Sequence, residues 1–354
     1  MSSMDAGIPS APSKPYTQSR TGGDATARAD LSILIINWKS VDYLKPCLAS
    51  IFREVQGIEF EVIVVDNASY DGSAELIRCE FPQVTFIQSS ENLGFIRGNN
   101  LAYRYATGRN LLLLNPDTEI IGGAITIMHS YLDSLPQAGI IGCRQVNADR
   151  SIQMNCIQPF PTILNQFFDS DYLRRKFPKS HLWGMAPLFE KQPTFTEVDM
   201  VCGACLMVKR QIFEEVGLLS LDYVMYSDDL DLCYKVKKAG YKVYFTNQAE
   251  VIHHGGKSSA SLKQAVSDVW IRDSMHKFLL KSRGKPYASV YKVAMASGAL
   301  TRLALLAFAK LIFGRGAHSQ RLAVAFTKWK RILQWAFGVT YWVKNADKAV
   351  ALPE

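Results

Sequence analysis

The chain has 354 residues, of which 48% are hydrophobic and 20% charged, so it belongs with globular proteins and is long enough to bury a large core. Its seven cysteines are scattered and odd in number, which argues against a disulfide framework and favours reduced thiols in the cytoplasm. The net charge of +8 is uneven, because the residues from Lys257 onward carry about +13 and the preceding part about −5.

Residues 1–30 are rich in Ser, Pro, Ala, Thr and Gly, and we expect them to form a disordered N-terminal tail. They contain no apolar run of the kind that forms the centre of a secretory signal peptide. Together with the cysteine content, this composition predicts a cytoplasmic protein.

Short apolar strands alternate with helical patterns in the first half of the chain. We expect the strands at residues 31–36, 61–65, 84–88 and 110–114. This alternation is typical of parallel βαβ units, and it predicts an α/β fold with a doubly wound sheet. The fourth strand contains four consecutive leucines and ends at Asn115-Pro116-Asp117, so it is expected to be buried on both faces and to carry a carboxylate at its end. The alternative is that these three residues only form a turn.

The regular alternation of strands and helices ends after Asp117. We expect a helix at residues 124–135, a strand at 139–144, an irregular and aromatic-rich stretch at 151–193, a strand at 198–208 interrupted by Gly203 and Ala204, and a helix that starts at the acidic cluster around Asp228. A last strand at 241–246 precedes the adjacent His253 and His254, which should point to opposite faces of an extended chain.

The polar residues at the strand ends also have structural explanations. Asp66, Asp228 and Asp229 could cap helices, and His253 could be a hydrogen-bonded core residue. However, Asp66 and Asp117 both follow strands of one parallel sheet, so they are expected at the same edge, where open α/β sheets bind ligands. The first strand is not followed by a glycine-rich phosphate loop, so a divalent cation is the expected source of positive charge for a phosphate.

Seven stretches between about residues 31 and 259 together resemble one family. They are LSILIINWKS, VVDNASYDGS, ENLGFIRGNN, LLLLNPDTEI, VCGACLMVKRQIFEEVG, YSDDLDLCYKVKKAGYKV and VIHHGGKSS. In this order they resemble the inverting GT-A glycosyltransferases of family 2, and most of all the branch with bacterial rhamnosyltransferases and galactofuranosyltransferases. The resemblance implies a GT-A catalytic domain at residues 31–260 with a mixed sheet.

The resemblance also implies an activity and the residues that perform it. The activity is metal-dependent inverting transfer of a sugar, with L-rhamnose from dTDP-rhamnose as the best guess, to a glycan or polyprenyl-linked acceptor in cell-surface polysaccharide synthesis. Asp229 would be the catalytic base, with Asp228 beside it. Asp117 and His253 would hold Mg²⁺ or Mn²⁺, with His254 left open as the ligand instead. The nucleotide-sugar would be bound by Asn37, Asp66, Asn92, Gly94, Asn115, Gly203 and Ala204.

The chain departs from the family pattern at two places. It has Leu219-Ser220-Leu221 where the family commonly has Phe-Asp-Glu, and Asp228 where a glutamate is usual. One alternative is therefore a catalytically silent protein of the same fold that binds nucleotide-sugars or acts as a scaffold. A nucleotidyltransferase is disfavoured, because it would need a basic, glycine-rich loop after the first strand.

Residues 261–354 are expected to form a basic, amphipathic helical extension. Residues 288–313 are apolar except for Lys292, Arg302 and Lys310, which fall on one narrow stripe at 100° per residue. This pattern favours a helix lying in the interface of an anionic membrane, on the cytoplasmic face, over one that crosses it. Further along the chain, the aromatic residues Trp329, Trp335, Tyr341 and Trp342 suit an aromatic belt at such an interface. The alternative is a pair of helices packed on the catalytic domain. Nucleic acid is disfavoured, because the acidic first part would repel it.

Overall fold

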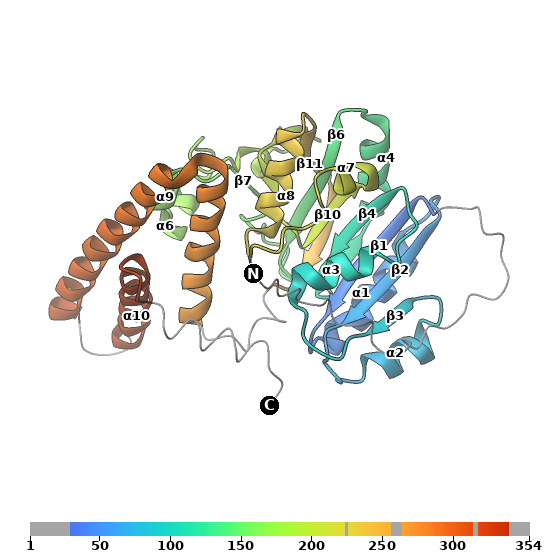
Figure 1. The fold of residues 1–354 in the computed structure, drawn as a ribbon, viewed down its shortest axis with the longest axis horizontal. Coiled ribbons are helices and arrows are strands. Elements are labelled where there is room, and N and C mark those ends of the chain that lie inside the picture. Colours follow the sequence, from blue (N-terminus) through green and yellow to red (C-terminus); the bar gives the residue numbers. More distant parts are fainter. Residues whose placement is uncertain (1–28, 224–225, 256–263, 314–317, 340–354) are drawn as a thin grey trace, which may run out of the picture.

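The computed structural model describes residues 29–223, 226–255, 264–313 and 318–339, so residues 1–28 of the predicted tail lie outside it (Figure 1). A nine-stranded sheet organises the described residues, in the order β3-β2-β1-β4-β10-β6-β11-β5, with β8 paired to β11. The strands are β1 (Leu31–Asn37), β2 (Phe60–Asp66), β3 (Thr85–Gln88), β4 (Asn110–Leu114), β5 (Thr118–Ile121), β6 (Ala138–Val146), β8 (Phe195–Val198), β10 (Cys205–Lys209) and β11 (Lys242–His253).

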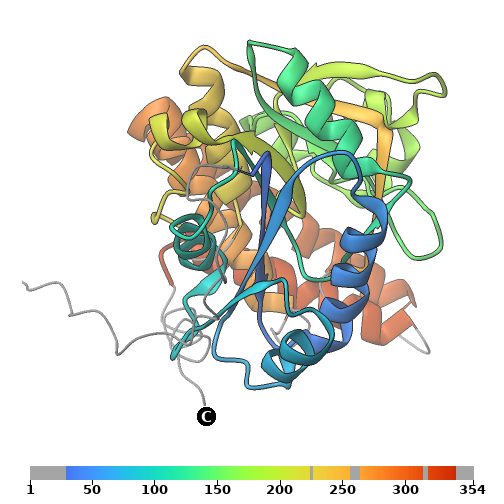
Figure 2. The same ribbon diagram turned by 90° about the vertical axis from the view of Figure 1, so that its right-hand side faces the viewer.

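The sheet is mixed, as expected for the GT-A fold. Strands β1 to β4 are parallel to one another where they pair, whereas β10 runs antiparallel to both β4 and β6. The helices that cover the sheet are α1 (Val41–Glu54), α2 (Ser73–Glu80), α3 (Gly94–Tyr103), α4 (Ala124–Ser134), α7 (Arg210–Glu215) and α8 (Asp228–Lys238). They lie on both faces of the sheet (Figure 2). The predicted α/β class and doubly wound mixed sheet are confirmed.

Strand β4 is buried over its full length because its leucines serve two hydrophobic cores. Leu111 and Leu113 belong to a cluster that includes residues of α8 and α9, and Leu112 and Leu114 belong to a second cluster with residues of α1 and α4. Successive side chains of a strand point to opposite faces, so an unbroken leucine run satisfies both. The expected central strand, buried on both faces, is confirmed.

Three segments differ from their expected form. The strand expected at residues 198–208 is divided into β8, β9 (Met200–Val201) and β10, and the break before β10 contains Gly203 and Ala204. Strand β5 was not expected; it follows Asp117 directly and pairs antiparallel with the end of β11. The irregular stretch contains short elements, namely β7 (Ile157–Gln158), α5 (Ile163–Phe167), α6 (Asp171–Lys176) and η1 (Ala186–Phe189).

The C-terminal extension consists of α9 (Gln264–Phe313) and α10 (His318–Ala336), which lie beside the sheet domain (Figure 1). Gly284 divides α9, because its φ of 83° and ψ of 172° are not helical, and Pro286 follows in the first turn after the break. We call the part before Gly284 the proximal segment of α9 and the part after it the distal segment. Trp270 and Phe278 of the proximal segment belong to the same core cluster as Leu113 of β4. The expected domain boundary at residue 260 lies outside the described residues.

Candidate active site

The ends of β1 and β2 bring Asn37 and Asp66 together. The two residues are partners in the parallel register, and Asn37 Nδ2 donates to Asp66 Oδ1 at 2.7 Å. The fully buried Asp66 carboxylate also accepts from Ser69 N at 2.9 Å, Gln88 Nε2 at 2.7 Å and Ser73 Oγ at 3.3 Å. Four donors fill about the number of lone-pair positions that a carboxylate offers. In this structure, Asp66 therefore orders the loop that follows β2.

Asn92 and Gly94 lie beside that loop. Asn92 Oδ1 accepts from Gly94 N at 2.9 Å, and Gly94 has a φ of 70°, a conformation that glycine adopts without strain. The Gly94 carbonyl accepts from Asn67 Nδ2 at 3.2 Å. Asn67 was not among the predicted site residues, although it directly follows Asp66. The predicted nucleotide-binding residues of these two loops are thus brought into one region at the carboxyl edge of the sheet.

Asn115, Asp117 and His253 converge at the end of β4 and β11. His253 Nε2 lies 3.3 Å from Asn115 Nδ2 and 3.4 Å from Asp117 Oδ1. Asp117 is 1% exposed and His253 is 7% exposed. His254 points elsewhere, because its Nε2 lies 2.6 Å from Glu119 Oε1. The alternation along β11 therefore brings His253, and not His254, to the Asp117 carboxylate.

Gln153 fixes the orientation of the His253 ring. Gln153 Nε2 donates to the His253 carbonyl at 2.6 Å and to Asn147 Oδ1 at 2.9 Å, so its amide oxygen faces His253 Nδ1 at 2.9 Å. That oxygen can only accept, so Nδ1 carries a proton, and in the neutral ring the lone pair is on Nε2, on the Asp117 side. Gln153 was missed from the sequence because it lies 100 positions before His253 in the irregular stretch.

This arrangement fits a hard divalent cation. Adjacent ligands of an octahedral Mg²⁺ at about 2.1 Å lie about 3.0 Å apart, close to the 3.4 Å between His253 Nε2 and Asp117 Oδ1. A metal-binding histidine typically donates its other N–H to a fixed acceptor, as His253 does to Gln153. Among the residues that the structure describes, no group of three or more His, Cys, Asp or Glu could hold a metal ion. Two side chains are enough where substrate phosphates and water complete the shell.

The loop at residues 202–204 connects this cluster to the acidic end of α8. Its Ala204 carbonyl accepts from Asn115 N at 3.0 Å, and its Gly203 N donates to Asp229 Oδ2 at 3.0 Å. A Cβ on Gly203 would lie 3.3 Å from Asp229 Cβ, so glycine permits this close approach. The two halves of the predicted site are therefore joined by one short loop.

Asp228 and Asp229 begin α8 and are partly buried. Asp229 accepts from Gly203 N and, at 2.8 Å, from Leu230 N, so its carboxylate is held partly by a residue outside the helix. Burial raises the pKa of Asp229. Burial, with the neighbouring charge of Asp229, raises the pKa of Asp228 to about 7. Both carboxyl groups therefore hold a proton more readily than an exposed aspartate does.

Comparisons with known proteins identify the family of the chain. The sequence model described as glycosyl transferase family 2 matches residues 32–217. The chain is 29% identical over 230 residues to the low-salt glycan biosynthesis hexosyltransferase Agl10 of Haloferax volcanii, covering 64% of this chain and 67% of that protein. It is 25% identical over 241 residues to the N-acetylglucosaminyl-diphospho-decaprenol L-rhamnosyltransferase of Mycobacterium tuberculosis, covering 65% and 77%.

A solved structure with a similar fold is the mannosyltransferase PcManGT from Pyrobaculum calidifontis in complex with GDP-Man and Mn²⁺. The two chains superpose with a TM-score of 0.56 at 17% identity, and the match covers 90% of this chain and 89% of that one. At this identity, the likeness concerns the fold alone.

Proposed function

The chain belongs to glycosyl transferase family 2 and is a glycosyltransferase of the GT-A fold, and we propose that it is a metal-dependent inverting enzyme. Its donor would be a nucleotide-diphospho-sugar, with dTDP-L-rhamnose as the leading candidate, and its acceptor a glycan or polyprenyl-linked glycan of the cell surface. The observation that carries the proposal is the joining of Asp117 and His253 to Asp229 through residues 202–204. The name of the mycobacterial relative describes L-rhamnosyl transfer to a lipid-linked acceptor, which supports the choice of substrates.

Asp117 and His253 would hold Mg²⁺ or Mn²⁺. When bound, such a cation would neutralise charge that develops on the leaving diphosphate. Gln153 would keep the Nδ1 proton of His253 away from the cation site, so that Nε2 remains available as a ligand. Asn37, Asn92 and the other residues of the two loops would bind the nucleotide, with Asp66 holding their conformation.

Asp229 would take the proton from the acceptor hydroxyl as the sugar is transferred. Its two hydrogen bonds from backbone N–H groups fix the carboxylate, and its raised pKa makes it a better base than an exposed aspartate. Asp228 would share the proton. A single displacement of this kind requires no covalent intermediate, so no nucleophilic serine or cysteine is needed.

A donor screen by thermal shift tests the proposal. We expect one nucleotide-sugar to raise Tm by several degrees only when Mn²⁺ is present, because the donor and the cation bind the folded state together. The Asp117→Asn variant should lose this response. Asp149→Asn, which changes an exposed carboxylate in a turn, is the matched control and should keep it. No response of the wild-type protein to any donor would contradict the proposed function.

We also propose that the distal segment of α9 binds an anionic bilayer. Val293, Leu300, Phe308 and Leu311 are 65, 53, 63 and 85% exposed, and their spacing puts them on one side of the helix over about 27 Å. Ser267–Ile312 is long and apolar enough to cross a membrane, but a single helix that meets this criterion is weak evidence for a membrane span. The helix is also interrupted at Gly284. A surface-lying helix agrees better with that break and with the excess of basic residues from Lys257 onward.

Two of the three basic residues on the predicted stripe contact α10, whereas we expected them to face the membrane. Lys292 lies over the Trp335 ring at 5.4 Å, and Arg302 lies over the Trp329 ring at 4.4 Å, so both cations pack on α10 instead of facing lipid headgroups. Trp335 is 1% exposed and is a core residue, which corrects its expected place in an interfacial aromatic belt. Trp342, predicted for the same belt, lies outside the described residues. The exposed Lys310 and Lys330 remain as candidates for contact with anionic lipids.

Vesicle flotation tests the membrane proposal. We expect the wild-type protein to float with vesicles that contain phosphatidylglycerol and to bind pure phosphatidylcholine more weakly. Replacing Leu300, Phe308 and Leu311 by serine should abolish flotation, because it removes about 25 cal/mol for each Å² of apolar contact. Replacing the exposed Tyr70, which lies in the sheet domain, is the matched control. A dimer in solution that the same triple variant dissociates would assign this face to a second copy of the chain.

A further inference from the structure

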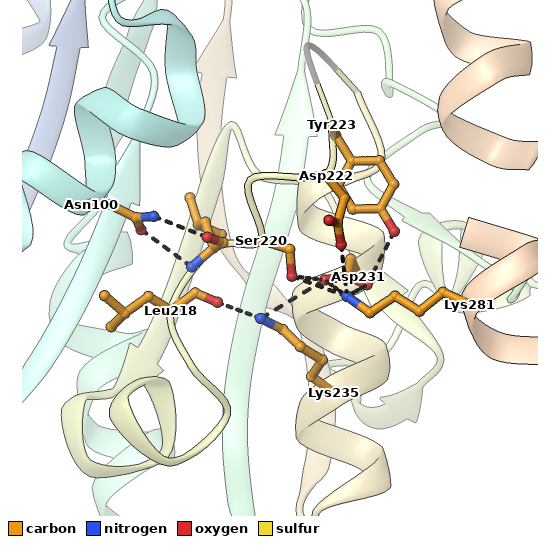
Figure 3. A network of polar contacts seen from close by, with 9 residues as sticks. Asn100, Leu218, Ser220, Asp222, Tyr223, Asp231, Lys235 and Lys281 are labelled. Carbon is orange, nitrogen blue, oxygen red and sulfur yellow. Dashed lines mark hydrogen bonds and ion pairs between the residues drawn. The ribbon is translucent and has the colours of Figure 1, made fainter. Parts of the chain in front are cut away.

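A buried carboxylate lies two positions after the candidate base. Asp231 is 0% exposed in the first turn of α8. Its carboxylate accepts from Ser220 Oγ, from Tyr223 Oη at 3.1 Å and from Lys281 Nζ at 3.0 Å (Figure 3). Burial and the Asp231 charge raise the pKa of Tyr223, so its hydroxyl remains a donor. A buried charge with these partners depends strongly on them, since removal of one partner typically leaves an uncompensated ion.

The nearest cation to Asp231 comes from the C-terminal extension. Lys281 lies on the proximal segment of α9 and also reaches Asp222 Oδ2 at 3.4 Å. Lys235, on α8 itself, is more distant from Asp231 at 3.8 Å, and its Nζ donates to the Leu218 carbonyl. The charge of Asp231 is therefore balanced mainly by a residue of another helix.

The same polar network reaches the donor side of the molecule. Asn100 lies on α3, the helix that starts at Gly94, and its side chain donates to the Leu219 carbonyl at 2.9 Å and accepts from Leu219 N at 3.2 Å. Residues 218–223 thus contact α3 on one side and Asp231 on the other, and Asp231 in turn contacts Lys281 (Figure 3). This segment leads along the chain into the catalytic pair.

We propose that Lys281 is a positioning residue for sugar transfer. By balancing Asp231, it holds residues 218–223 and the first turn of α8 together, and so keeps Asp228 and Asp229 in place for the acceptor. The inference rests on the proposed function in assigning the base to Asp229. Asp228, Asp229 and Asp231 lie in one helical turn and repel one another. Without Lys281, this repulsion would lose its nearest balancing positive charge.

A double-mutant cycle tests this role. Lys281→Met should lower kcat by roughly tenfold and raise the KM for the acceptor, while the KM for the donor changes less than about twofold. Lys281→Arg should restore most of the activity, because it keeps the charge. Lys281→Met combined with Asp231→Asn should recover at least about threefold in kcat over Lys281→Met alone, since the uncompensated buried charge is then gone. Lys277→Met, on the same segment and paired with Asp273 near the surface, should behave as wild type.

Failure of the positioning role and failure of the proposed function give different results. Two results obtained with an active wild-type enzyme would overturn the positioning role. One is that the changes in kcat in the cycle are strictly additive, and the other is that the KM for the donor rises as much as the KM for the acceptor. Failure of the proposed function would be seen instead in the wild-type protein, as the absence of a metal-dependent Tm response to any donor. A retained Tm response to the donor in Lys281→Met, together with a roughly tenfold lower kcat for transfer, is the result that we expect.

Discussion

The proposed donor side and the proposed acceptor side of the site are held together in different ways. On the donor side, Asn37 and Asp66 lie at the ends of paired strands and are connected by hydrogen bonds to nearby loops. On the acceptor side, Asp231 depends on Lys281, which comes from a helix 50 residues further along the chain. The donor side is thus built by the sheet, whereas the acceptor side is completed by the C-terminal extension.

This difference indicates where specificity can change. Strand register fixes the positions of the donor-side residues, and a strand cannot shift by one residue without exposing its buried face. A contact such as Lys281 to Asp231 joins two surfaces that can vary independently of the sheet. A substitution at this contact can therefore alter the proposed acceptor side while the sheet and the proposed donor side stay unchanged. Three predictions test this comparison.

The largest effect is expected at the base. Asp229→Asn should lower kcat by roughly 10²–10⁴-fold, because the acceptor hydroxyl loses its proton acceptor, while the KM for the donor should change little. Initial rates with each substrate varied in turn would measure this split. Asp149→Asn makes the same change at an exposed carboxylate in a turn and is the matched control, which should lower kcat far less. Donor hydrolysis or transfer that survives in Asp229→Asn would show that the base has been misassigned.

A smaller effect is expected on the donor side at Gln153. Gln153→Leu should weaken Mn²⁺ binding by roughly 10–100-fold, because the Nδ1 proton of His253 loses its acceptor and the ring can turn. Isothermal titration of Mn²⁺ in the presence of the nucleoside diphosphate would measure it. Gln153→Glu keeps an acceptor and should retain most of the affinity. Unchanged binding in Gln153→Leu would mean that the packing around His253 fixes the ring without this hydrogen bond.

The smallest effect is the pH dependence of stability at Asp228. Burial raises its folded-state pKa to about 7, above the value of about 3.9 in an unfolded chain. The protonated form is therefore favoured by folding, and this contribution is lost as the pH rises through about 7. Asp228→Asn should be more stable than wild type by about 1 kcal/mol at pH 8, after allowance for solvent screening, and equal to it near pH 4. Urea unfolding at both pH values measures the difference, and a variant that is less stable at pH 8 would contradict the assignment.

The sequence was sufficient for the central parallel strands β1, β2 and β4 and for the polar residues at their ends, but not for β5 or for the division of the strand expected at residues 198–208. The leucine run of β4 follows from local periodicity and led to Asp117, whereas His253 was assigned from the family resemblance, with His254 left open until the structure placed His253 beside Asp117. Gln153 could not be predicted, because it reaches His253 from an irregular segment with no periodic pattern. The role of Arg302 was also missed, since helical periodicity gives the stripe on which it lies but not the helix that packs on it.

The break in α9 has a geometric consequence. Gly284 has a backbone conformation that residues with a side chain rarely adopt, and it lies three positions after Lys281. The angle of the distal segment is therefore set within one helical turn of the contact to α8. If the apolar face of that segment lies on a bilayer, as we propose, the break at Gly284 would set the distance between the sheet domain and the lipid headgroups.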